Sequence, residues 1–82
     1  MRVEDINEPI QVLALCAGGT IRPLRFRWSG RTYRIDAVNG QWTDRGDGGY
    51  SLNYSVQAGD ETYFIRFAGM EVQWWLDRQM LE

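Results

Sequence analysis

Three consecutive hairpin candidates in this 82-residue chain share one apolar face. Each strand candidate alternates apolar and polar side chains, with the period of two that is typical of a half-buried β-strand. Directly opposed residues of a hairpin share a face, so placing the turns at the glycines determines which side chains meet. The pattern predicts an antiparallel, all-β fold with a core of Phe26, Tyr33, Ile35, Tyr54, Val56, Tyr63, Ile65, Phe67, Val72, Trp74 and Leu76.

The turn positions predict the register of each hairpin. Ser29-Gly30 is a plausible two-residue turn, and it sets Phe26 opposite Tyr33. Gly69-Met70 has glycine at the first position, as a type II′ turn requires. With a further turn at Gly59-Asp60, the other expected pairs are Leu24 with Ile35, Val56 with Tyr63, Tyr54 with Ile65, Leu52 with Phe67, Phe67 with Val72, Ile65 with Trp74 and Tyr63 with Leu76.

The chain is expected to form one small β domain over residues 1–82, with residues 1–8 and 78–82 frayed or the end weakly helical. A first strand over 10–15 follows Pro9. Asn39-Gly40 is either a hairpin turn or a bulge in one bent strand. Five to six short strands cannot make two full sheets, so we expect a meander that forms a strongly curved sheet or a small SH3-like or OB-like barrel.

Composition limits how such a domain can be stabilised and where it can reside. A chain of this size buries only about 60–65% of its unfolded surface, and four Trp, four Tyr and three Phe can supply a dense core. One cysteine and no histidine exclude an internal disulfide and the usual zinc ligand sets. No segment has the ~20 apolar residues of a membrane span. These features together predict a soluble cytoplasmic protein.

Enzyme chemistry finds little support in the sequence. Without histidine, Ser-His-Asp and Cys-His devices are absent. Cys16 ends an apolar strand, which predicts a buried structural thiol. Asp44 and Asp47 are the nearest carboxylate pair, and they lie in a glycine-rich segment where solvation explains them. We therefore expect a non-enzymatic protein with no cofactor and no metal site.

Arginine is distributed unevenly along the chain. Residues 21–45 hold six arginines against two aspartates, whereas the rest holds three arginines against nine carboxylates, and lysine is absent. A GC-rich genome would explain the use of arginine, and so would a surface that needs planar donors for phosphate or carboxylate. Arg25, Arg27 and Arg34 should project from one outer face, with Arg25 directly opposite Arg34. That pairing is unfavourable unless a carboxylate, solvent or an anionic partner offsets it.

Two large aromatic residues are expected on the face opposite the core. Phe64 and Trp75 oppose each other in the expected register of the last hairpin, on a face that is otherwise polar. Exposed aromatic residues of this size need a cover. The cover could be the terminal segments, a closed barrel, a second copy of the chain, a protein partner or the bases of a nucleic acid.

Several segments resemble a known family. Asn7 to Val12, Arg22 to Ile35 and Trp42 are similar to the E-P-[IV]-x-V opening, the R-P-x-x-F-x-W-x-G-R-x-Y-x-[VI] hairpin and the later Trp of a domain-of-unknown-function family of small bacterial β proteins. The resemblance covers about residues 7–78. It implies a bacterial source and an occasional association with DNA-repair polymerase-like proteins. This chain differs in a longer glycine-rich turn after its first strand.

Together these observations favour a small β-barrel interaction module that binds a protein partner, or a second copy of itself, through Phe64 and Trp75. The alternative is a single-stranded nucleic-acid-binding accessory domain. In that case Arg25, Arg27 and Arg34 would hold phosphates while exposed aromatic rings stack on bases. The net charge of −2 favours the protein partner, whereas the clustered arginines favour the nucleic acid.

Overall fold

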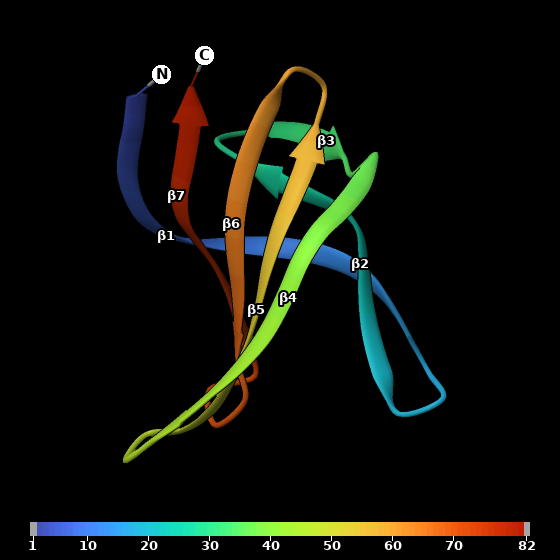
Figure 1. The fold of residues 1–82 in the computed structure, drawn as a ribbon, viewed down its shortest axis with the longest axis vertical. Coiled ribbons are helices and arrows are strands. Elements are labelled where there is room, and N and C mark those ends of the chain that lie inside the picture. Colours follow the sequence, from blue (N-terminus) through green and yellow to red (C-terminus); the bar gives the residue numbers. More distant parts are fainter. Residues whose placement is uncertain (1, 82) are drawn as a thin grey trace.

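The structure is a computed structural model that describes residues 2–81. These residues form seven antiparallel strands in one strongly curved sheet, which makes a half-barrel (Figure 1). The predicted all-β class is confirmed, although five or six strands were expected. The strands are β1 (Arg2–Ala17), β2 (Thr20–Trp28), β3 (Arg31–Arg34), β4 (Ala37–Gly46), β5 (Gly49–Ala58), β6 (Glu61–Ala68) and β7 (Gln73–Leu81), in the sheet order β3-β2-β1-β7-β6-β5-β4.

The first strand is longer than predicted and organises the curvature. Its N-terminal part pairs with β7 and its C-terminal part pairs with β2, with a bulge between Asp5 and Glu8. Figure 1 shows β1 bending sharply and the start of β1 lying beside the end of β7. Residues 2–5 pair with residues 78–81, where the sequence suggested fraying, because each segment supplies the backbone partners of the other. Residues 1 and 82 lie outside the described part of the chain. Within that part, no helix is long and apolar enough to cross a membrane.

The core fills the concave side of the sheet. Phe26 stacks on Tyr33 with ring centroids 5.0 Å apart, and Tyr63 meets the edge of the Phe26 ring at 5.2 Å. Offset and edge-to-face arrangements of this kind stabilise aromatic clusters beyond their burial alone. The buried core residues are Ile10, Phe26, Tyr54, Val56, Ala58, Tyr63, Ile65 and Leu76, and Tyr33, Ile35, Leu52 and Trp74 pack partly buried against them.

Two of the three predicted hairpin registers are confirmed. Phe26 lies opposite Tyr33 across β2 and β3, and Tyr54 lies opposite Ile65 across β5 and β6. Both hairpins have the two-residue turns that their glycines indicated. Leu24 remains 36% exposed, although the alternation placed it inside, because the β1–β2 ladder shifts register beside it.

The register predicted for the last hairpin is wrong. The turn between β6 and β7 spans four residues, 69–72, so the pairing moves by two residues and Phe67 lies opposite Trp74. A shift of two keeps each side chain on its face, and Leu76 is therefore buried as expected. Val72 falls in the turn and is 75% exposed, so its assignment to the core was wrong.

The Asn39-Gly40 dipeptide is a bulge, which decides between the two alternatives. The β4–β5 ladder shifts register between Val38 and Gly40, so β4 continues through this point as one strand. The chain passes from β3 at one edge of the sheet to β4 at the other edge through Ile35 and Asp36. The amide of Ile35 donates to β2 at Leu24 O (3.0 Å), and the amide of Asp36 donates to β5 at Gln57 O (2.8 Å). These bonds tie the two edges together at one end of the half-barrel.

Candidate interaction surfaces

The predicted arginine stripe lies on the outer face of β2 and β3. Arg25 is directly opposite Arg34, Arg27 is opposite Thr32, and all three arginines are exposed. Within residues 2–81, the ion pairs are Arg2 with Glu4 and Arg66 with Asp77, so the stripe has no carboxylate at ion-pairing distance. The guanidinium groups are therefore available, and their mutual repulsion is not offset by an internal ion pair among these residues.

Apolar side chains of β1 border the stripe, and they were not among the predicted site residues. Leu13 lies opposite Arg25 and Leu15 lies opposite Arg22, and the two leucines are 51% and 50% exposed. The signal was available, because Leu13 and Leu15 alternate with the inward-facing Val12. The outer surface formed by Leu13, Leu15, Arg22, Arg25, Arg27 and Arg34 is named the basic face below.

Phe64 and Trp75 lie on the outer face of β6 and β7 but are not opposite each other. Trp75 pairs with Arg66 and Phe64 pairs with Arg78, because of the four-residue turn and a bulge beside Phe64. Each ring is covered by the arginine across from it. The Cζ atom of Arg66 lies 5.6 Å from the Trp75 ring centroid, and that of Arg78 lies 4.7 Å from the Phe64 centroid.

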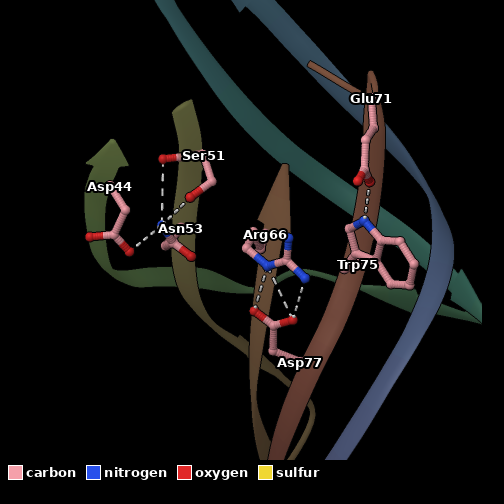
Figure 2. A network of polar contacts seen from close by, with 7 residues as sticks. All are labelled: Asp44, Ser51, Asn53, Arg66, Glu71, Trp75 and Asp77. Carbon is pink, nitrogen blue, oxygen red and sulfur yellow. Dashed lines mark hydrogen bonds and ion pairs between the residues drawn. The ribbon is translucent and has the colours of Figure 1, made fainter. Parts of the chain in front are cut away.

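Polar contacts surround Trp75 and its neighbour Arg66 (Figure 2). The Arg66 guanidinium donates from Nε to Asp77 Oδ2 at 3.0 Å and from Nη2 to Asp77 Oδ1 at 3.1 Å. The indole Nε1 of Trp75 donates to Glu71 Oε1 at 3.1 Å. This part of the outer face is thus largely satisfied by its own side chains, which reduces its need for a partner.

Asn53 forms a separate polar cluster on the outer face of β5. It is only 7% exposed, although it lies on the outer face between Trp42 of β4 and Arg66 of β6. Its Nδ2 donates to Asp44 Oδ2 and to Ser51 Oγ, each at 3.3 Å (Figure 2). Asp44 therefore has a structural partner, where the sequence suggested a solvated loop carboxylate.

The basic face and the surface that carries Phe64 and Trp75 adjoin across β1. Pro9 lies opposite Trp75, and two residues further along Gln11 lies opposite Arg27. A hollow of about 320 Å³ lies between them, lined by Arg27, Gln11, Pro9 and Gln73 among others. The aromatic residues and the stripe are thus neighbours, but Arg66 beside Trp75 is paired with Asp77, whereas Arg25, Arg27 and Arg34 have no ion pair within residues 2–81.

Cys16 and the carboxylates do not come together into a catalytic or metal-binding group within the described residues. Cys16 is exposed rather than buried, because it lies near the tip of the β1–β2 hairpin beyond the core. Among residues 2–81 no group of three or more His, Cys, Asp or Glu side chains is placed to hold a metal ion.

Burial raises the pKa of the Tyr54 hydroxyl, with a smaller contribution from Cys16, and burial likewise raises the pKa of Tyr63. Both hydroxyls thus favour their neutral form.

Comparison with known proteins gives a family and no activity. The model of a family described as a domain of unknown function, DUF6504, matches residues 1–79. The chain belongs to the DUF6504 family. This confirms membership of a domain-of-unknown-function family, while the detailed motif pattern and the association with DNA-repair proteins stay predictions. Neither a curated protein nor a solved structure matches the chain, so the comparison identifies no catalytic family.

Proposed function

We propose that this domain is a non-enzymatic interaction module that binds an acidic segment of a partner protein through the basic face. The observation that carries the proposal is the direct opposition of Arg25 and Arg34, both exposed. Residues 20–34 hold five arginines and no carboxylate, so the charge is concentrated on one hairpin. Like charges opposed across strands are unfavourable, and an anionic partner would relieve them.

The chemistry of the basic face suits carboxylates. Arginine presents a planar fork that binds a carboxylate through two parallel hydrogen bonds, and such charge-assisted bonds are stronger than neutral ones. Leu13 and Leu15 add exposed apolar area beside Arg25 and Arg22. A segment that alternates acidic and aliphatic residues would match both features. These features favour a binding surface on β1–β3 over one at Phe64 and Trp75, whose rings are already covered by Arg78 and Arg66.

A protein segment fits this face better than single-stranded nucleic acid does. Binding of a single strand relies on exposed aromatic rings that stack on bases. The aromatic residues of β2 and β3 are Phe26, Trp28 and Tyr33, and they pack against the core or one another. The rest of the chain outside residues 21–45 has three arginines against nine carboxylates, which repel a long polyanion.

The experiment uses fluorescence anisotropy with a short labelled peptide of alternating Glu and Leu. We expect salt-sensitive binding that the double variant Arg25→Glu with Arg34→Glu weakens at least tenfold, since two charge-assisted bonds of about 1.5–3 kcal/mol each are lost. The control is Arg2→Glu with Arg31→Glu, which makes the same change of charge outside the basic face. Equal weakening by both variants would contradict the proposal.

A second probe distinguishes peptide binding from the alternative function, the binding of single-stranded nucleic acid. Oligothymidylate is titrated into the wild type at the same ionic strength, and we expect it to bind more weakly than the peptide. Tighter binding of the oligonucleotide, lost in the Arg25→Glu with Arg34→Glu variant, would instead support nucleic-acid binding through Arg25, Arg27 and Arg34.

A further inference from the structure

The half-barrel is open along one side, between β2 and β4. β2 pairs with β3 only from Arg25 onward, so residues 20–24 have no strand partner on that side within the described chain, and the Leu24 carbonyl accepts only the amide of Ile35 there. β4 is the other edge of the sheet and pairs only with β5. Figure 1 shows the β1–β2 hairpin and the β4–β5 hairpin diverging away from the closed end. The opening between residues 20–24 and residues 37–46 is named the seam below.

Side chains of β2 and β4 line the seam and enclose two hollows. A volume of about 460 Å³ lies between Ile21 of β2 and Gln41, Thr43 and Arg45 of β4. A second hollow of about 350 Å³, nearer the closed end, is lined by Arg22, Val38 and Tyr54 among others. The two edges therefore face each other across a groove that no strand of the described chain fills.

The seam is held open by specific bonds. The Tyr54 hydroxyl donates to the Ile21 carbonyl of β2 at 2.7 Å, so a side chain takes the place of a backbone partner there. At the closed end the Asp36 carboxylate accepts the amide of Gly59 at 2.9 Å. These bonds set the separation of β2 from the sheet behind it, and they predict a preformed groove rather than a mobile gap.

The lining of the seam is apolar and basic. Ile21, Val38 and Leu52 supply apolar surface, and Arg22 and Arg45 supply the charge. Asp36 is the carboxylate among the lining residues, and its Oδ2 atom is already engaged by Gly59. At its closed end the seam reaches Leu24 and Ile35, the chain neighbours of the opposed pair Arg25 and Arg34. The seam therefore continues the basic face.

We propose that the acidic partner segment binds in extended form, as an added strand on the free edge of β4 within the seam. This inference rests on the proposed function and specifies its binding mode. An exposed strand edge offers a row of unpaired N–H and C=O groups to such a segment. Side chains of a strand alternate between its two sides, so the acidic residues enter the hollow, where Arg22 and Arg45 lie, while the aliphatic residues stay on the outer side beside Trp42. The bulge at Asn39 restricts regular pairing to residues 40–46.

A second copy of this chain is a poorer occupant. Pairing of two β4 edges would bring together two hollows, each lined by Arg22 and Arg45 and by no carboxylate, because Asp44 of β4 lies on the outer face. The like charges would repel, whereas an acidic segment complements them. Charge complementarity therefore selects a partner segment over self-association.

The test compares the Glu-Leu peptide with the same peptide N-methylated at alternate backbone amides. N-methylation removes strand-pairing donors but keeps every side chain and charge. We expect about tenfold weaker binding of the peptide methylated on one set of alternate residues, and little change for the other set, since only one set faces β4. Equal affinity of all three peptides would overturn the added-strand inference.

Protein variants distinguish this inference from the proposed function. Arg45→Glu, at a seam residue outside the basic face, should weaken the unmodified peptide about tenfold, and amides of residues 40–46 should exchange more slowly in the complex. If only Arg25→Glu with Arg34→Glu weakens binding, the proposed function stands and the seam inference fails. If no peptide binds, both fail. Light scattering that shows a dimer broken by Arg45→Glu would also overturn the inference, in favour of self-association.

Discussion

Arg25 and Arg34 lie directly opposite each other on adjacent strands, both exposed, on the outer face of the β2–β3 hairpin. A hairpin that served only the fold would gain from an opposite charge at one of these positions. The pair thus adds unfavourable energy to the free domain and places two guanidinium groups where one anionic segment can reach both.

Arg34→Glu should stabilise the free domain while it weakens binding. The substitution converts a like-charge pair into an opposite-charge pair, and we expect a gain of about 0.5 kcal/mol in the free energy of unfolding. Urea denaturation at low ionic strength measures it. The control is Arg27→Glu, because Arg27 faces Thr32 and gains no opposite charge. A loss of stability in Arg34→Glu would show that the opposed arginines are already compensated.

Tyr54→Phe should destabilise the domain by about 1–3 kcal/mol, because it leaves the Ile21 carbonyl without its hydroxyl donor. The ring volume is unchanged, so the loss measures the bond that spans the half-barrel rather than core packing. Tyr50→Phe is the control, because Tyr50 is 46% exposed. Equal effects in the two variants, read from urea midpoints, would remove Tyr54 from its bridging role.

Gly49→Ala should cost about 1–2 kcal/mol, because Gly49 has φ +100 and an added Cβ would meet the Met70 side chain. Gly48→Ala is a control one residue away, since a Cβ there meets no atom within 4 Å. We expect Gly48→Ala to stay within about 0.5 kcal/mol of the wild type. Thermal unfolding of the two variants tests the difference, and similar melting temperatures would contradict the turn geometry.

Stability should be lost at alkaline pH through the buried tyrosines. Burial raises the pKa of Tyr54 and of Tyr63 above their ordinary value of 10.0, so the folded state favours the neutral hydroxyls. The contribution of these neutral hydroxyls to the free energy of unfolding is fully present below pH 10.0. It declines as the pH rises through the higher folded-state pKa values. Urea midpoints across this range measure it. A midpoint that stays constant well above pH 10 would contradict the burial of these hydroxyls.

The sequence predicted those parts of the fold that two-residue turns determine. Ser29-Gly30 and Gly59-Asp60 gave correct registers, because a short turn leaves one pairing that keeps the apolar residues together. The four-residue turn over 69–72 has no equally strong signature. For this reason the predicted core position of Val72 and the predicted pairing of Phe64 with Trp75 were wrong. The pairing shifted by two residues, which kept Leu76 in the core.

The surfaces were predictable only where they lie on one hairpin. The opposition of Arg25 and Arg34 follows from the local Ser29-Gly30 turn, so the sequence alone was sufficient to predict it. The seam depends on the position of β2 relative to β4, which the bend of β1 and the bonds of Ile35 and Asp36 determine. No local pattern encodes that relation. The exposure of Cys16 was missed for the same reason, because alternation does not reveal where a hairpin leaves the core.

The most direct test of the account is a titration of the ¹⁵N-labelled domain with the Glu-Leu peptide, followed in ¹H–¹⁵N correlation spectra. We predict salt-sensitive shifts at Leu13, Arg25 and Arg34, with few at Phe64 and Trp75. Absence of shifts, or shifts centred on Phe64 and Trp75, would contradict the claim that the basic face binds an acidic protein segment.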